Sequence, residues 1–159
     1  MKWSCVVLYL LVTRGECDDQ QGGAVSDLCL TCLCEAASQC DLKFRCDHDV
    51  CGPFKIIRDY WIDGGSLGGG GWETCAMDTQ CAVNTVRGYM SKYKKDCDGD
   101  GEVDCQDYAR MHKLGGVGCV NEPGEDFLKF KRDLDTCLAE VNTSMNSIMY
   151  AANFTFEAN

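Results

Sequence analysis

Acidic residues recur between positions 96 and 107 at the spacing of a twelve-residue calcium loop. Such a loop supplies oxygen ligands from positions 1, 3, 5, 7 and 12, the seventh through its backbone carbonyl, and turns at a glycine in position 6. Position 12 is Asp107 here, where calcium loops have the longer glutamate, and Asp104 could instead cap a following helix. A calcium site and an acidic turn are therefore both open, and no other cofactor is expected. The candidate calcium ligands are Asp96, Asp98, Asp100, Glu102 and Asp107.

Fourteen cysteines in 159 residues point to disulfide chemistry. Cys5 and Cys17 lie in an N-terminal segment that we expect to be removed, which leaves an even number for six disulfides. Zinc is the alternative, because Cys29 and Cys32 form a CxxC pair, but no second CxxC follows. The cysteines expected to pair are Cys29, Cys32, Cys34, Cys40, Cys46, Cys51, Cys75, Cys81, Cys97, Cys105, Cys119 and Cys137.

The first seventeen residues have the pattern of a secretory signal peptide. Lys2 precedes the apolar run at residues 3–12, and Gly15 and Cys17 follow where a signal peptidase would cut. A transmembrane anchor is the weaker alternative, because it needs about 20 apolar residues. We therefore predict a signal peptide over residues 1–17 and a secreted, extracellular protein.

The formal net charge at pH 7 is −10, and removal of two basic residues and one acidic residue with the signal peptide leaves −11. An acidic surface is repelled at long range by phosphate backbones and by anionic membranes. We therefore expect neither a nucleic acid nor a membrane as a partner. The length suits one domain, which we expect to be a monomer.

The spacing of apolar residues predicts a mainly helical α+β domain with a small β-hairpin. Ser26 or Asp27 is placed to cap the first helix, and Gly115 to end a later one. The β-branched and aromatic residues between 54 and 62 favour the hairpin. In chain order we expect a helix over 28–40, the hairpin over 54–62, a glycine-rich connector over 66–72, and helices that include residues 82–93, 104–114 and 127–138.

From residue 140 to 159 the chain is polar and carries two N-glycosylation sequons, at Asn142 and Asn153. We expect this segment to be a mobile, glycosylated tail.

Six motifs follow one another in fixed order: CLTCLC at 29–34, CGPF at 51–54, YWID at 60–63, NTVRGYM at 84–90, YARMH at 108–112 and GGVGC at 115–119. Together they resemble the invertebrate-type lysozyme (destabilase) family over residues 28–138. The resemblance implies a lysozyme-like fold with a cleft between its helical part and its small β segment. It also implies an antimicrobial or digestive glycosidase that hydrolyses the β-1,4 bond between N-acetylmuramate and N-acetylglucosamine of peptidoglycan.

That hydrolysis needs one carboxyl that donates a proton and a second that stabilises or attacks the anomeric carbon. The family's acid is a glutamate in a pattern resembling Cys-x-x-Glu-Ser-Gly-Cys, and residues 34–40 match it with Ala37 at the acid's position. Glu35 is a candidate substitute acid, although two helical positions turn it by about 200°. The second carboxylate matches Asp49, with several residues missing before the Cys-Gly-Pro motif. We therefore expect a glycosidase activity that is weak or lost.

Tyr60, Trp61 and Asp63 are candidates for a cleft wall that stacks on sugar rings and bonds their hydroxyls, or for core and turn roles. Some family members are credited with isopeptidase activity, for which His112 is a candidate base; it is also a candidate substrate-binding residue. A lone helical histidine more often has a packing role. Three functions stay open: a glycosidase, a non-catalytic protein that binds amino-sugar polymers, and an isopeptidase.

Overall fold

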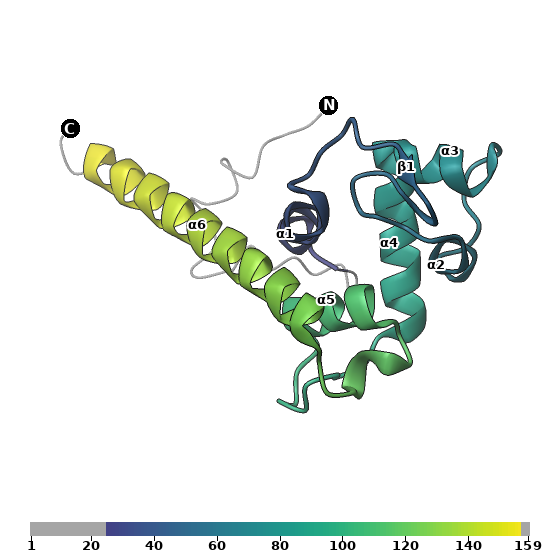
Figure 1. Cartoon of the computed structure of the whole chain (residues 1–159). Helices are drawn as coiled ribbons and strands as arrows, with labels where there is room; N and C mark the ends of the chain where they lie inside the picture. The colour runs from purple at the N-terminus through teal and green to yellow at the C-terminus, as the bar shows by residue number, and fades with distance from the viewer. Residues whose placement is uncertain (1–24, 157–159) are drawn as a thin grey trace.

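A computed structural model describes residues 25–156, with side chains through residue 144 (Figure 1). The predicted signal peptide, residues 1–17, lies outside the described residues. Within residues 25–156, no helix combines the length and the apolar character that crossing a bilayer requires. The fold is mainly helical with one small sheet, as the sequence predicts.

The first helix, α1 (Asp27–Ser38), starts at the predicted cap, where the Ser26 hydroxyl accepts a hydrogen bond from the Cys29 N–H at 3.1 Å. It ends at Gln39 in the left-handed conformation. Its buried face, which includes Cys32 and Leu33, packs against the last helix. The other side of α1 lies at the surface, where its residues border the hollows described below.

The predicted central helices are confirmed. Helix α4 (Thr79–Tyr93) buries Ala82, Val86 and Met90 completely, at the spacing of one helical face. Helix α5 (Cys105–Leu114) begins with a capping box. The Asp104 carboxylate accepts a hydrogen bond from the backbone N–H of Asp107, and the Asp107 carboxylate accepts one from the backbone N–H of Asp104. It stops at Gly115, whose φ of 84° suits glycine.

The β-hairpin exists, but its predicted position over residues 54–62 is wrong. Strands β1 (Cys46–Asp47) and β2 (Val50–Cys51) pair antiparallel, with Cys46 opposite Cys51. Residues Arg58–Asp63 form helix α2 instead of a strand. The aromatic residues that favoured a strand are placed by packing, because Tyr60 stacks on Tyr89 of α4 with 3.6 Å between ring centroids.

Helix α3 (Gly71–Met77) begins inside the predicted connector, and the short 3-10 helix η2 (Gly118–Val120) follows α5. The last helix, α6 (Glu125–Phe156), projects away from the rest of the molecule in Figure 1. It continues through the segment expected as a tail, since Leu138 and Val141 keep the helical spacing and pack against the core. Asn142 is exposed on α6; glycosylation stays a prediction.

All twelve predicted cysteines form disulfides, so the CxxC pair does not bind zinc. Cys29 and Cys32 join α1 to α5 and α6, which fixes the three helices around the core. The six bonds are Cys29–Cys105, Cys32–Cys137, Cys34–Cys40, Cys46–Cys51, Cys75–Cys81 and Cys97–Cys119.

Candidate active-site cleft

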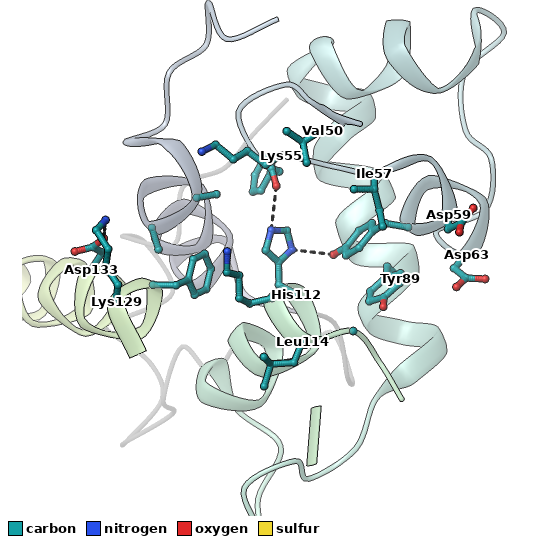
Figure 2. Close-up of a pocket in the computed structure, with 17 residues that line it drawn as sticks. Val50, Lys55, Ile57, Asp59, Asp63, Tyr89, His112, Leu114, Lys129 and Asp133 are labelled. Atoms are coloured by element: carbon teal, nitrogen blue, oxygen red, sulfur yellow. Dashed lines mark hydrogen bonds and ion pairs between the residues drawn. The ribbon is translucent and has the colours of Figure 1, made fainter. Parts of the chain in front are cut away.

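A cavity of about 550 Å³, here called the main cleft, lies where α1, the segment after β2, and helices α2, α4, α5 and α6 meet. Its inner wall is aromatic and its rim is charged. Figure 2 shows Asp59 and Asp63 on one side of His112, with Lys129 and Asp133 on the other. The aromatic wall consists of Phe54, Tyr60, Tyr89, His112 and Phe130.

His112 is held by both ring nitrogens (Figure 2). Nε2 lies 3.0 Å from the Phe54 carbonyl oxygen and donates to it, so Nδ1, 3.1 Å from the Tyr60 hydroxyl, accepts from that hydroxyl. Burial lowers the pKa of His112 to about 4, against the effect of the Phe54 bond, and Lys113 lowers it further. The ring is therefore neutral near pH 7 and links α5 to α2 and to the chain after β2.

Tyr60 lines the main cleft and is largely buried. Burial raises the pKa of its hydroxyl well above the ordinary value, and Tyr89 adds to this effect. The hydroxyl bonds His112, and the ring stacks on Tyr89. Tyr60 thus offers the cleft only a small part of its surface.

Asp63 also lines the main cleft, yet both of its oxygens are engaged. One carboxylate oxygen accepts from Lys92, and the other accepts from the Tyr93 hydroxyl at 2.7 Å. These two hydrogen bonds, the Lys92 bond first, lower the pKa of Asp63. Trp61 is half-buried outside the cleft lining, and its indole N–H donates to the Leu67 carbonyl at 2.9 Å.

Ala37 and Glu35 differ in the hollows that they line. Ala37 lines both the main cleft and a second hollow of about 670 Å³ between α1 and α6, whereas Glu35 is exposed and lines only the second hollow. We call this second hollow the side groove. Glu35 does not reach the main cleft, because two helical positions rotate a side chain by about 200°.

Asp49 lies at the exposed tip of the β1–β2 hairpin, and its neighbour Val50 is the residue that reaches the main cleft. The structure therefore does not bring Asp49 and Ala37 into one cavity. The carboxylates that do line the main cleft are Asp59, Asp63 and Asp133. Asp133 pairs with Lys129 at 3.3 Å. Among the described residues, no glutamate lines this cleft.

The acidic loop brings together three of its five candidate calcium ligands. Carboxylate oxygens of Asp96, Asp98 and Asp107 lie within 4.8 Å of one another. The buried Asp107 accepts backbone N–H bonds from Cys97 at 2.6 Å and from Asp104 at 2.8 Å, so its oxygens already have partners. Asp100 and Glu102 are exposed and lie outside this group. Calcium binding stays a prediction.

Sequence reasoning missed Phe54, Tyr89 and Phe130 as cleft residues. Phe130 lies in the stretch 127–138 and Tyr89 in the stretch 82–93, and the sequence predicts both stretches only as helices. Helical spacing identifies a buried face, but it does not say which part of that face borders a cavity. Lys55, Lys113 and Lys129 gave no signal, because surface lysines are common on any helix or turn.

Known proteins similar to this chain are lysozymes. The family model Destabilase matches residues 26–137. A lysozyme of Ostrea edulis is 45% identical over 103 residues, which cover 61% of this chain and 72% of that protein. Invertebrate-type lysozyme 6 of Caenorhabditis elegans is 32% identical over 126 residues, covering 72% and 83% respectively. The crystal structure of Tapes japonica lysozyme matches with a TM-score of 0.56 at 34% identity, covering 70% of this chain and 89% of that one.

Proposed function

Because the chain belongs to the destabilase family of invertebrate-type lysozymes, we propose that it is a secreted protein that binds amino-sugar polymers and hydrolyses peptidoglycan weakly or not at all. Secretion is supported by six disulfides, which persist in oxidising compartments. The main cleft is the proposed binding site. Its volume of about 550 Å³ suits part of a polymer, and its aromatic wall and charged rim suit a sugar's faces and hydroxyls.

The observation that carries the loss of hydrolysis is the methyl group of Ala37 in the wall of the main cleft. The family resemblance gives this position to the proton-donating glutamate. A general acid needs a raised pKa, usually from burial, so that it holds its proton near neutral pH. Asp63 has a lowered pKa, and Asp133 is paired with a lysine, so neither of these cleft carboxyls has that environment.

Two competing activities have less support. Hydrolysis through Glu35 would need this side chain to act from the side groove, because it does not line the main cleft. Isopeptidase chemistry through His112 would need a free ring nitrogen to serve as base, and both nitrogens are hydrogen-bonded within the fold.

The two halves of the proposal are tested on the same insoluble material. We expect the purified protein to be retained on peptidoglycan and chitin, and to be released by soluble N-acetylglucosamine oligomers. Clearing of bacterial walls, measured by turbidity, should be at least about a hundredfold slower than clearing by the Ostrea edulis lysozyme. Clearing at a comparable rate would refute the loss of activity. Failure to bind either polymer would refute the binding function.

A further inference from the structure

The second half of α6 differs from the first half in charge. Residues 125–140 include eight charged side chains and residues 141–156 include none, although a quarter of the whole chain is charged. Figure 1 shows this second half as the part of α6 that projects from the rest of the molecule. Charged side chains normally keep such a surface solvated and prevent association. A projecting helix without them needs another polar cover.

Both N-glycosylation sequons of the chain lie in this uncharged half. Asn142 begins the sequon Asn-Thr-Ser, and Asn153 begins the sequon Asn-Phe-Thr. Asn142 is exposed on α6 and lines neither the main cleft nor the side groove. The folded helix therefore leaves position 142 accessible to a bulky modification.

The register of α6 places the two asparagines on one flank of the helix. They are eleven positions apart, so their directions differ by only about 20° and their separation along the axis is roughly 16 Å. Lys131 and Asp135 lie on the same flank, eleven and seven positions before Asn142. These two residues form an ion pair at 2.6 Å, and neither lines a hollow. The described part of this flank thus faces away from both hollows.

The hollows border the opposite side of α6. Asp133 lines both of them, and the nine positions between Asp133 and Asn142 correspond to a rotation of about 180°. Glu140 lines the side groove and lies two positions before Asn142, a rotation of about 200°. A glycan at position 142 would therefore start on the side of the helix that faces away from the hollows.

We propose that Asn142 and Asn153 both carry N-linked glycans, which cover the uncharged half of α6 from one flank and leave the main cleft open to its polymer. N-linked glycans are bulky and solubilising, and they supply the polar cover that this half of the helix lacks in charge. The inference rests on the secretion that is part of the proposed function, because N-glycans are added in the secretory pathway.

The modification is a group transfer from an oligosaccharide linked to a lipid diphosphate. The side-chain amide nitrogen of the asparagine attacks C1 of the first sugar and loses one proton. The bond between C1 and the diphosphate oxygen breaks, the bond between nitrogen and C1 forms, and the lipid diphosphate leaves.

Occupancy is tested on the full chain, produced in cultured eukaryotic cells and recovered from the medium. We expect intact mass spectrometry to show two glycans, and peptide-N-glycosidase, which converts a glycosylated asparagine to aspartate, to locate them at positions 142 and 153. Asn142→Gln and Asn153→Gln should each remove one glycan. Ser144→Ala keeps Asn142 but removes the sequon hydroxyl, so it should remove the same glycan as Asn142→Gln. Asn146→Gln is the matched control, because it makes the same change on α6 outside a sequon and should keep both glycans.

The outcomes separate this inference from the proposed function. Protein in the medium with the mass of the unmodified chain, or with one glycan only, would overturn the paired glycans and leave secretion standing. Protein that stays unprocessed inside the cells would contradict both.

The position of the glycans is tested by removing them from the folded protein. Retention on peptidoglycan and chitin should change less than about twofold, because the glycans lie away from the hollows. Self-association, measured by light scattering against concentration, should increase, because the uncharged half of α6 loses its cover. A severalfold gain in retention would contradict the flank assignment, and unchanged scattering would contradict the covering role. If neither form is retained, the binding function fails, and the mass spectrometry still decides whether the glycans are present.

Discussion

His112 joins three segments around the main cleft through its two nitrogens and its backbone. The Phe54 bond requires a proton on Nε2, and the Tyr60 bond requires a lone pair on Nδ1, so the fold selects one neutral tautomer. Through these hydrogen bonds His112 holds the segments of the cleft wall together. Its contribution should appear in the pH dependence of stability.

The pKa of His112, about 4, is below the ordinary value of about 6.5 in an unfolded chain. As pH falls from about 6.5 towards 4, the unfolded chain takes up a proton that the folded chain does not, so the free energy of unfolding decreases. We expect this decrease to be at most roughly 3 kcal/mol in the natural protein and to be absent from the His112→Gln variant, whose amide does not titrate. Urea denaturation at several pH values measures both, and parallel profiles would contradict this role.

Part of the site could be predicted residue by residue. A strong local pattern, the cysteine spacing around residues 34–40, places Ala37, and that residue does line the cleft. Asp49 has the right sequence neighbours, yet the shortened hairpin leaves it at an exposed tip. Its position depends on a loop length, and a loop length does not specify where a turn points. Asp63 was predicted as a cleft residue from its residue type. Its hydrogen bonds come from Lys92 and Tyr93 of α4, about thirty positions away in the sequence, and no local pattern predicts them.

Among the elements, the turn after β2 is constrained by close packing. Gly52 has a φ of +68°, and a methyl group on its Cα would lie 1.7 Å from the Ala76 carbonyl oxygen of α3. Gly99 has a similar φ of +83° but open space around it. Substitutions at Gly52 and Gly99 therefore separate the energetic cost of the backbone conformation from the cost of the close packing.

We expect Gly99→Ala to lower the free energy of unfolding by about 1–2 kcal/mol, the cost of a left-handed conformation. Gly52→Ala should lower it by roughly 1–3 kcal/mol more, because α3 must shift. Thermal or chemical denaturation in calcium-free buffer measures both. Equal losses in the two variants would mean that the turn does not pack on α3 as described.

The helices were predictable and the hairpin position was not, for a physical reason. Ala82, Val86 and Met90 repeat at one helical period over several turns, so local sequence alone identifies their buried face. The stretch around Tyr60 is short, and its preference for strand is weaker than the gain from stacking on Tyr89, a partner twenty-nine positions away. Short elements follow their tertiary contacts.

Calcium binding by the acidic loop, residues 96–107, is a testable prediction. If the ion binds, the melting temperature should rise with millimolar calcium, because a ligand that binds only the native state stabilises it. Affinity should be weaker than at sensor sites, since Asp107 is short and already accepts two backbone bonds. Asp98→Ala should abolish the rise. An unchanged melting temperature in the natural protein, or an equal rise in the variant, would show that the loop does not bind calcium.

For the whole molecule, the disulfides differ in the length of chain that they close. Cys32–Cys137 spans 105 residues and ties α1 to α6, whereas Cys75–Cys81 spans 6. In the chain-entropy account, the longer loop restricts the unfolded state more. Replacing both members of the long pair by alanine should cost about 2–5 kcal/mol, and more than replacing the short pair. A larger loss from the short pair, by denaturant unfolding, would contradict this order.

The central claim is that the family's cleft persists without its proton donor, and Ala37→Glu tests it most directly. Loss of general acid catalysis typically costs about 10²–10⁴ in rate. Partial burial in the cleft wall should raise the pKa of the new carboxyl, so that it holds its proton near neutral pH. The control Ala37→Gln has the same shape but no acid. We predict that the glutamate variant clears bacterial walls measurably faster than the natural protein, and that the glutamine variant does not. A fully active natural protein that loses its activity in Glu35→Gln and gains nothing in Ala37→Glu would contradict the account.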